Sequence, residues 1–359
     1  MDHQGRRARF LAKMAQAGWA AAMIITSYEN RRYFSGFSGS FGYLLMTPSR
    51  TVLLTDSRYT QQAQEEAPDI LHKKVGGLTA IAELAKLLQD VDDGPIGFDG
   101  RLADYPTYVA LAAQFGADRL VDLSDMVDAQ RGVKDADEIA LLAQAEAIGD
   151  AAFQVACERM RAGMTEVEVA LILETEMRRR GAQSTSFDTI VASGARGALP
   201  HGLASGKKMA EGDLVVMDFG CKFNGYCSDM TRTVAIGQPS AGLQDLYALV
   251  LKAQKACLDA ARAGVIGAEV HQIAVDLFSD AGMGAYFGHG LGHSVGLEIH
   301  EKPVFSPAQQ SALPAGTVIT VEPGLYLPGQ GGVRIEDVIA LTDDGCLNLT
   351  HSPKELLIL

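Results

Sequence analysis

Three histidines, four glycines and two glutamates occur between Phe287 and Glu301, in the segment FGHGLGHSVGLEIHE. Histidine can bind a metal or transfer a proton near neutral pH, and glycine lets the backbone approach a ligand closely. His289 and His293 are four residues apart, but the surrounding glycines argue against a regular helix. No glutamate follows the first histidine, as it would in an H-E-x-x-H zinc helix. Any metal here therefore needs ligands from elsewhere, and the alternative is a glycine-rich turn whose histidines bond only the local backbone.

Four carboxylates are predicted to lie on core strands, where an unpaired charge is costly. Asp218 ends the apolar run LVVM, and Asp229 lies on the next strand-like segment, after a turn around Asn224. We expect this hairpin to place the two aspartates side by side. Glu322 follows the apolar run TVITV, and Glu336 follows the strand-like residues VRI. For any single one of these acids, an ion pair or an edge-strand position is the alternative.

A common site formed by these four acids and His293 would need a cation. Like charges held close together raise one another's pKa values or require compensation, and a pair of divalent ions would provide it. Carboxylates with one imidazole form a hard, oxygen-rich site that suits Mn²⁺, Co²⁺, Fe²⁺ or Zn²⁺. Two such ions can ionise a shared water and bind both oxygens of a tetrahedral intermediate. The residues therefore predict metal-dependent hydrolysis.

The composition is that of an ordinary folded globular protein, because 47% of the 359 residues are apolar and 21% are charged. This length allows two domains. The formal net charge of −13 argues against a surface for nucleic acid or for an anionic membrane, because both need clustered lysine and arginine. No apolar run is long enough to cross a bilayer.

The N-terminal residues and the cysteines indicate a cytoplasmic protein. Basic residues between Arg6 and Arg9 precede an apolar stretch, as in a secretory signal, but Lys13 and Gln16 interrupt that stretch. We predict instead an amphipathic helix that leads into a strand. The five cysteines have no metal-type CxxC spacing, so we expect reduced, partly buried thiols. Cys221 and Cys227 flank the aspartate hairpin, and we expect them to pack and not to bind metal.

The pattern predicts two domains, residues 1–130 and 131–359, with a polar stretch from Asp125 to Asp137 around the boundary. The first domain alternates helix-like and strand-like segments, which predicts an α/β arrangement. Beyond a first helix that includes Phe10, the expected helices are Tyr59–Ala67, Leu78–Gln89 and Tyr105–Phe115, and the expected strands are Ala21–Thr26, Tyr43–Thr47, Thr51–Thr55, Ile96–Phe98 and Leu120–Leu123. The GFSGSFG stretch lacks both the lysine and the strand-to-helix context of a phosphate loop.

The second domain is predicted to be α+β, with strands that are mostly linked as hairpins. Its expected helices are Glu138–Met160, Thr165–Arg180, Leu243–Ala263 and Glu269–Ala281, and its expected strands are Thr189–Ala192, Asp213–Phe219, Tyr226–Ala235, Val318–Glu322 and Val333–Leu341. Thr165 followed by Glu168 is a good helix cap. We assign no site role to the histidines outside the motifs, which are His3, His72, His271 and His351.

Five residues occur in an order that resembles the metal-dependent pita-bread peptidases, which include aminopeptidase P, prolidase and methionine aminopeptidase: Asp218, Asp229, His293, Glu322 and Glu336. The matching segments are MDFGCKFNGYCSDMTRT, HGLGHSVGLEIHE, VEPGLY and VRIEDV, and the resemblance runs from Lys134 to the end. RRYFSGFSGSFG and LLTDSRYTQQA resemble the creatinase-type N-terminal domain of the proline-specific members, which methionine aminopeptidases lack. The resemblance implies an α/β N-terminal domain and an α+β pita-bread domain, in which helices cover a mostly antiparallel, curved sheet.

The same resemblance implies roles for the site residues. The five residues would hold two metal ions, with the aspartates binding in bidentate fashion or as bridges. The family's nucleophile is a hydroxide between the two metals, and Glu322 helps to take and pass on its proton. His201, His289 and His300 match substrate-side histidines, which donate hydrogen bonds to the substrate or the intermediate. Arg334 matches an arginine that orients the carboxylates.

The activity that the resemblance implies is that of an Xaa-Pro aminopeptidase, a hydrolase that removes an N-terminal residue before proline. We favour it because GFSGSFGYLL followed by TDSRY resembles small, bacterial-type aminopeptidase P more than it resembles prolidase. Prolidase, a dipeptidase, is the alternative, while a metal-dependent lyase and an inactive binding module are more remote. The implied cofactors are two divalent ions, Mn²⁺ first, with Co²⁺ or Zn²⁺ as alternatives. The implied partners are peptides with proline at the second position and a second copy in a homodimer.

Overall fold

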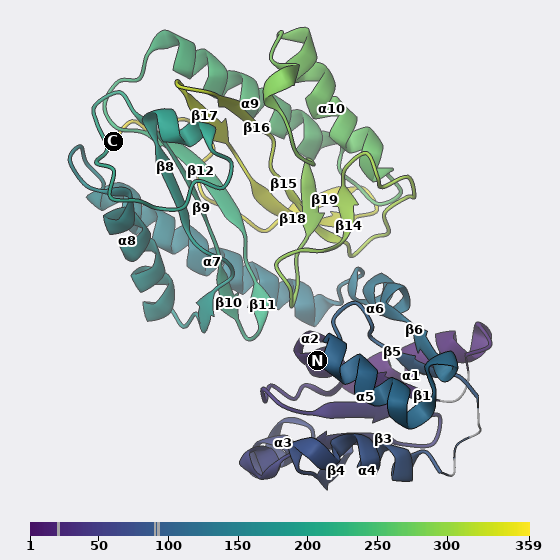
Figure 1. Ribbon diagram of the computed structural model, residues 1–359. Helices are drawn as coiled ribbons and strands as arrows, with labels where there is room; N and C mark the ends of the chain where they lie inside the picture. The colour runs from purple at the N-terminus through teal and green to yellow at the C-terminus, as the bar shows by residue number, and fades with distance from the viewer. Residues whose placement is uncertain (20–21, 90, 92–93) are drawn as a thin grey trace. The chain divides into compact units, whose positions relative to one another are not determined.

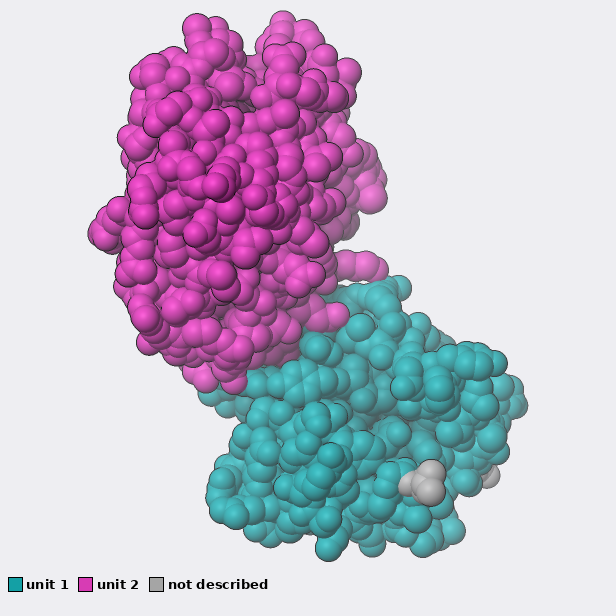
Figure 2. Space-filling model, turned by 60° about the vertical axis from the view of Figure 1, so that its left-hand side comes forward, with its two compact units in different colours: residues 1–131 teal, residues 132–359 magenta. Residues whose placement is uncertain are grey.

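The computed structural model describes residues 1–19, 22–89, 91 and 94–359 (Figure 1). The chain divides into two compact units, Met1–Arg131 and Gly132–Leu359, called unit 1 and unit 2 (Figure 2). Each unit has its own buried clusters of apolar side chains. The two units are therefore described separately.

Unit 1 is an α/β unit built on a six-stranded sheet with the order β4-β3-β2-β1-β5-β6. Strand β1 pairs antiparallel with β2 and parallel with β5, so the sheet is mixed. The strands are β1 (Ala22–Ile25), β2 (Tyr43–Met46), β3 (Thr51–Thr55), β4 (Leu71–Lys74), β5 (Ile96–Phe98) and β6 (Leu120–Asp122). The α-helices are α1 (His3–Gln16), α2 (Tyr28–Ser35), α3 (Thr60–Glu66), α4 (Ala80–Leu87), α5 (Tyr105–Phe115) and α6 (Ser124–Arg131).

A buried aspartate explains where β1 ends and α2 begins. Asp99 follows β5 and accepts hydrogen bonds from the backbone and hydroxyl groups of Thr26 and Ser27. Ser27 is also the N-cap of α2, where its hydroxyl accepts from Asn30 N. Helix α2 was absent from the sequence prediction, because a short polar helix shows little apolar periodicity. Its start depends on a residue that lies far away in the sequence.

Most of the predicted elements of unit 1 are confirmed. Strand β5 and helix α5 have the predicted bounds, and β2 and β3 form the predicted hairpin. The predicted strand Ala21–Thr26 corresponds to β1, although Ala21 lies outside the described residues. Strand β4 was not predicted. The polar stretch that begins near Asp125 contains another unpredicted element, α6, whose Val127 is buried.

Unit 2 combines long helices with strands that pair antiparallel, in the orders β11-β10-β7, β12-β9-β8, β14-β13-β15-β18-β19 and β16-β17. The helices are α7 (Ala136–Arg159), α8 (Glu166–Arg179), α9 (Ala241–Ala260) and α10 (Gly267–Asp280), and 3₁₀ turns include η4 (Gly194–Ala198) and η5 (Gly284–Tyr286). Before α9 lie β7 (Ser184–Thr185), β8 (Ile190–Ser193), β9 (Leu214–Phe219), β10 (Cys221–Phe223), β11 (Tyr226–Cys227) and β12 (Met230–Ala235). After α10 lie β13 (Gly292–Ser294), β14 (Glu301–Phe305), β15 (Val318–Val321), β16 (Gly324–Leu327), β17 (Gly331–Arg334), β18 (Asp337–Thr342) and β19 (Gly345–Asn348).

Two helix pairs cover the strands of unit 2. Helices α7 and α8 pack with β8, β9 and β12 in one core cluster, which includes Phe153 and Leu173. Helices α9 and α10 pack with β15, β17 and β18 in a second cluster, which includes Val250 and Phe278. Two helices followed by antiparallel strands thus occur twice along the chain (Figure 1). The structure confirms the expected α+β architecture of antiparallel strands covered by helices.

Helix α7 is the central helix of one of these clusters. Among the described residues, it is the helix that could cross a membrane by length and composition, but 44% of its most apolar window is buried inside the protein. Its Ala145 and Phe153 belong to the core of unit 2. A capping box of Asp135 and Glu138 begins α7, and the predicted box at Thr165 begins α8.

Two of the predicted strands are interrupted in the structure. The predicted strand Tyr226–Ala235 is β11 and β12, and Asp229 lies in the break between them. The predicted strand Val333–Leu341 is the end of β17 and most of β18, and Glu336 lies in that break. Strand β15 ends one residue before Glu322. Alternating apolar residues predict an extended chain, but they do not reveal a local change in backbone direction.

Candidate metal centre

Asp218 lies within the regular strand β9, whereas the other three predicted carboxylates lie where a strand is interrupted or ends. Thr231 of β12 is opposite Asp218 in the antiparallel ladder. Asp229 therefore precedes the residue opposite Asp218 by two positions, so the two aspartates come from neighbouring segments but are not a directly opposite pair. A smaller hairpin, β10 and β11, lies between them, and Asn224 and Gly225 form its turn with positive φ angles of 45° and 82°.

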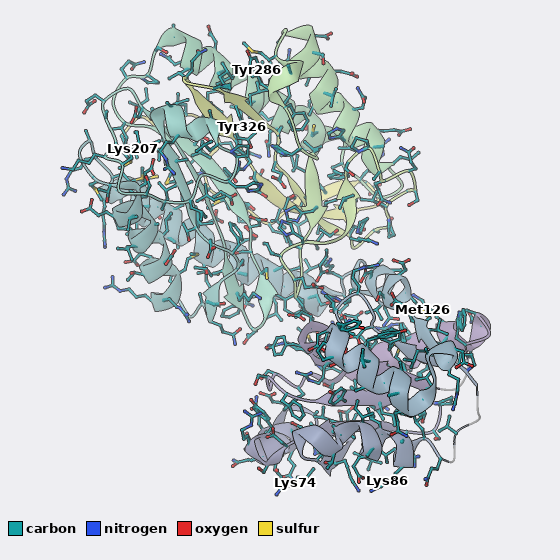
Figure 3. The ribbon with its side chains drawn as sticks, in the orientation of Figure 1. Lys74, Lys86, Met126, Lys207, Tyr286 and Tyr326 are labelled. Atoms are coloured by element: carbon teal, nitrogen blue, oxygen red, sulfur yellow. The ribbon has the colours of Figure 1, made fainter. Side chains whose placement is uncertain are left out.

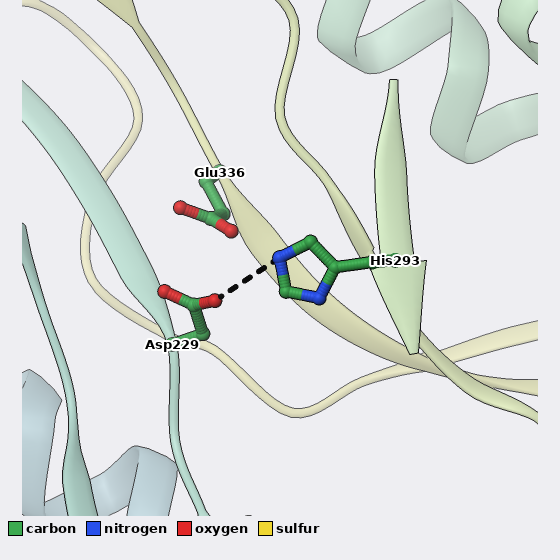
Figure 4. Close-up of side chains that lie close together, drawn as sticks. All are labelled: Asp229, His293 and Glu336. Atoms are coloured by element: carbon green, nitrogen blue, oxygen red, sulfur yellow. Dashed lines mark ion pairs between the residues drawn. The ribbon is translucent and has the colours of Figure 1, made fainter. Parts of the chain in front are cut away.

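The strand breaks bring Asp229 and Glu336 together with His293 of β13 (Figure 4). One ligand atom from each of these three residues lies within 4.8 Å of the others. His293 Nε2 is 3.6 Å from Asp229 Oδ2 and 3.4 Å from Glu322 Oε1. Successive side chains of a regular strand point to opposite faces. At a break in a strand, a side chain need not follow this alternation. Acids from different strands can therefore point toward the same imidazole.

The acids of this cluster are buried and repel one another. Burial, followed by the charges of the neighbouring acids, raises the pKa values of Asp229 and Glu336 well above their ordinary values. Burial also raises the pKa of Glu322. Burial lowers the pKa of His293, which favours the neutral ring with a free nitrogen lone pair. A cation at this position would offset the cost of ionising the acids.

Arg334 is a buried cation that contacts both an acid and a tyrosine of the site. Its Nη2 donates to Asp218 Oδ2 at 2.6 Å, its Nε donates to Thr231 Oγ1 at 3.0 Å, and its Nη1 donates to Tyr326 Oη at 2.7 Å. Tyr326, which Figure 3 labels, lies on β16. Its Oη is also 3.0 Å from His289 Nε2. Arg334 thus orients Asp218 directly and His289 through one hydroxyl group.

The residues of the cluster fit a divalent cation. Asp218 Oδ1 is buried, and no donor among the described residues reaches it. A buried carboxylate oxygen without a partner is costly, and coordination to a metal would satisfy it. Asp229, His293 and Glu336 provide two carboxylates and one imidazole within reach of a common ion, a donor set that suits Mn²⁺, Fe²⁺, Co²⁺ or Zn²⁺. Glu322 adjoins this group beside His293.

Comparison with known families identifies the catalytic class of unit 2. A profile of metallopeptidase family M24 matches residues 140–343. The chain belongs to metallopeptidase family M24. A profile of the creatinase/prolidase N-terminal domain matches residues 6–133. The expected family and fold class are therefore confirmed, and a metallopeptidase family implies that divalent metal takes part in the reaction.

Two solved structures and one curated protein that are similar to this M24 chain match more than nine tenths of it. An Xaa-Pro dipeptidase from Bacillus anthracis is 40% identical with a TM-score of 0.95, and the match covers 99% of this chain and 100% of that one. An X-Pro aminopeptidase from Thermotoga maritima is 39% identical with a TM-score of 0.91, with coverage of 99% and 100%. A curated Xaa-Pro dipeptidase of Pyrococcus furiosus is 38% identical over 93% of this chain and 94% of its own length.

The three histidines that were predicted to face the substrate, His201, His289 and His300, are not among the clustered ligand atoms. The ring centroid of His300 is 4.4 Å from that of His293. His201 lies in an exposed turn after η4. Burial lowers the pKa values of His289 and His300, and His201 adds to this effect. His289 Nδ1 is 2.7 Å from the carbonyl oxygen of Gly290, so Nδ1 donates there and Nε2 accepts from the tyrosine hydroxyl described above.

Three residues that support the site were absent from the sequence prediction. Thr231 Oγ1 donates to Glu336 Oε2 at 2.6 Å, and Tyr326 contacts Arg334. Both lie inside the M24 motifs DMTRT and VEPGLY, which was an available signal. The third is Glu146 on α7, which accepts a hydrogen bond from Asp229 N. In the sequence, it is distinguished only as a charged residue within a largely apolar helical pattern.

Proposed function

We propose that this chain is a metal-dependent Xaa-Pro dipeptidase, or prolidase, which hydrolyses the bond between a residue and a following proline. The observation that carries the proposal is the buried cluster of Asp229, His293 and Glu336, in which mutually repelling acids and a neutral imidazole share one position. The relatives at 40% and 38% identity that are named Xaa-Pro dipeptidase favour this activity over the aminopeptidase activity expected from the sequence.

The proposed cofactor is a pair of divalent metal ions, with Mn²⁺ as the first candidate. The residues that would hold them are Asp218, Asp229, His293, Glu322 and Glu336. Such ions would supply a water that ionises near neutral pH and would polarise the scissile carbonyl group. The donor-free Oδ1 of Asp218 supports its inclusion, although its other oxygen is held by Arg334.

The side chains of the protein would orient the peptide and move protons. Glu322, with Oε1 beside His293 and bonded to Thr320 Oγ1, would take the proton of the attacking water and pass it to the leaving nitrogen. His300 would donate to the oxyanion that develops on the scissile carbonyl. His289 Nε2, which accepts from the Tyr326 hydroxyl, would instead accept a hydrogen bond from a donor group of the substrate after it exchanges this contact. Among the proposed substrate groups, His201 and His300 are exposed and His289 is half-buried, so a peptide could meet His201 and His300 first.

An Xaa-Pro aminopeptidase is the second candidate, because the Thermotoga maritima relative has that name and matches 99% of the chain. The two activities differ in whether the proline carboxylate must be free. Hydrolysis of Xaa-Pro dipeptides and of Xaa-Pro-Xaa tripeptides should be compared in Mn²⁺, Co²⁺ and Zn²⁺ after chelation. We expect the dipeptides to be cleaved faster. Cleavage of the tripeptides alone would replace the dipeptidase proposal by the aminopeptidase.

We also propose that the enzyme is a homodimer in the cytoplasm. All five cysteines are free thiols, which is typical of a reducing compartment. Burial raises the pKa values of Cys221 and Cys227, so these thiols are unreactive packing groups near neutral pH. Light scattering of the purified protein should give twice the mass of one chain, and the mass of a single chain would contradict the dimer.

A further inference from the structure

His271 is a buried histidine that lies outside the metal cluster and its substrate-side histidines. It belongs to the buried face of α10, together with Val270, Ala274 and Phe278, and its exposed fraction is 7%. A histidine on such a face usually satisfies a local polar group. Its partner here is instead a backbone group of the segment that carries His289 and His293.

The ring of His271 accepts a hydrogen bond from that segment. Leu291 N donates to His271 Nδ1 at 3.2 Å, so Nδ1 is unprotonated and the neutral ring carries its proton on Nε2. Burial lowers the pKa of His271, which favours this neutral form. The side chain of Leu291 is fully buried, so its N–H has no route to bulk water without a local opening.

Both backbone polar groups of Leu291 are hydrogen-bonded, the N–H to His271 and the carbonyl to Glu322. The carbonyl oxygen accepts a hydrogen bond from Glu322 N at 2.8 Å. Leu291 therefore connects the ring of His271 to the backbone of Glu322. It also lies midway between His289 and His293 in the sequence. A displacement of Leu291 would therefore move all three of these site residues.

The ring of His271 makes a second contact with the same segment. Its centroid is 5.5 Å from that of Phe287, with an angle of 33° between the ring planes. Phe287 in turn packs edge-on against His289, with centroids 5.1 Å apart. The acceptor and the ring face of one side chain thus contact the segment on both sides of His289.

We propose that His271 is a positioning residue for the peptidase reaction: by accepting from Leu291 N, it fixes the backbone that aligns His289, His293 and Glu322. This inference rests on the proposed function for its catalytic consequence. Its structural part, that the acceptor fixes the segment, can be measured without catalysis. The metal ions need not touch His271 for the effect to occur.

Three substitutions separate the acceptor from the packing. H271N keeps an acceptor near the position of Nδ1. H271L has almost the same shape as the asparagine of H271N but has no acceptor. H271F keeps an aromatic ring against Phe287, also without an acceptor. If the acceptor is decisive, H271L and H271F share a defect that H271N does not have. If either of the two apolar variants does not fold, the other still makes the comparison with H271N.

The first readout is hydrogen exchange of the Leu291 amide, measured by mass spectrometry on peptides that cover residues 287–293. We expect H271L and H271F to exchange about tenfold to a hundredfold faster than the wild type, the ratio that corresponds to leaving a buried donor unpaired. We expect H271N to exchange at nearly the wild-type rate. Equal exchange in H271N and H271L would overturn the proposal.

The second readout is Mn²⁺ binding to the metal-free protein, and the third is steady-state hydrolysis of an Xaa-Pro dipeptide. We expect H271L to bind Mn²⁺ more weakly and to lose kcat by about tenfold or more, with a smaller change in KM, and we expect H271N to restore both. If the wild type hydrolyses no Xaa-Pro peptide, the proposed function fails, but exchange and Mn²⁺ binding still test His271. Unchanged Mn²⁺ affinity and kcat in both apolar variants would overturn the positioning role.

Discussion

The carboxylate of Glu146, on the buried face of α7, accepts a hydrogen bond from the backbone nitrogen of Asp229 at 2.9 Å. Its other oxygen accepts from Thr350 Oγ1 at 3.0 Å, and Thr350 Oγ1 accepts from Val338 N at 3.0 Å. Val338 follows Glu336 by two residues. One side chain on a helix therefore holds the backbone at Asp229 and, through Thr350, the strand that begins after Glu336.

This relationship predicts that one substitution of Glu146 weakens metal binding and stability and that another preserves both. E146A leaves the N–H of Asp229 unpaired, so it should weaken Mn²⁺ binding and lower the free energy of unfolding by about 1–3 kcal/mol. E146Q should retain both properties, because burial raises the pKa of Glu146 to about 8 and glutamine resembles the neutral acid. Calorimetric titration of the metal-free protein and urea unfolding measure the two effects. The control is E158A, on the exposed side of the same helix, and equal metal affinity in E146A and E158A would contradict the prediction.

Asp229→Asn tests the metal assignment itself. Asparagine has nearly the same shape but no charge, so the variant should bind little Mn²⁺ and should lose peptide hydrolysis. Metal content by mass spectrometry and dipeptide turnover measure this outcome. Asp276→Asn makes the same chemical change at an exposed position on α10 and should leave both properties unchanged. Full turnover in the Asp229 variant would refute the assignment.

The fold could be predicted largely from local patterns. The apolar periodicity of α5, α9 and α10 and the capping box at Thr165 are signals contained in short windows, and the predicted elements agree with the structure to within a few residues. The unpredicted helix α2 depends on Asp99, which lies about 70 residues away along the chain. Contacts across such separations leave no trace in periodicity.

The candidate site could be predicted as a set of residue types but not as a geometry. The acids stood out because each lies on, or directly follows, a segment predicted to be a core strand, and the order of the motifs resembles that of a family in which they meet. The breaks at Asp229 and Glu336 could not be predicted, because a single-residue change in strand direction depends on tertiary hydrogen bonds. The bond from Glu336 N to Thr231 O and the Arg334 network are examples. His271 received no site role in the sequence prediction for the same reason, because its hydrogen bond to Leu291 N is also a tertiary contact that the sequence pattern does not reveal.

His300→Ala tests whether the substrate-side histidines are separate from the metal ligands. The ring of His300 packs against His293 with centroids 4.4 Å apart, but it does not belong to the described cluster of ligand atoms. The variant should keep its metal content while its turnover falls by about 10² to 10³, the usual effect of losing one transition-state donor. Turnover and metal content should be measured on the same preparation. Loss of metal from the variant would show that His300 is a ligand.

The pH dependence of metal stabilisation follows from the raised pKa values of Asp229, Glu322 and Glu336 in the metal-free protein. A group whose pKa is higher in the folded state contributes stability that is fully present below its unfolded pKa. That contribution is lost as the pH rises through the folded pKa. The three carboxyl groups should therefore stabilise the metal-free protein near their ordinary pKa values of about 4 and destabilise it progressively above them.

Mn²⁺ should reverse this loss, because a metal binds the ionised carboxylates and competes with protons for them. The increase in unfolding temperature on addition of Mn²⁺ should therefore be larger at about pH 8 than at about pH 5. Thermal unfolding followed by intrinsic fluorescence, with and without Mn²⁺ at each pH, measures the difference. The Asp229→Asn variant should show a smaller increase at both pH values, because one of the coupled charges is absent. An increase in the wild type that is the same at both pH values would mean that these carboxyl groups do not bind the metal.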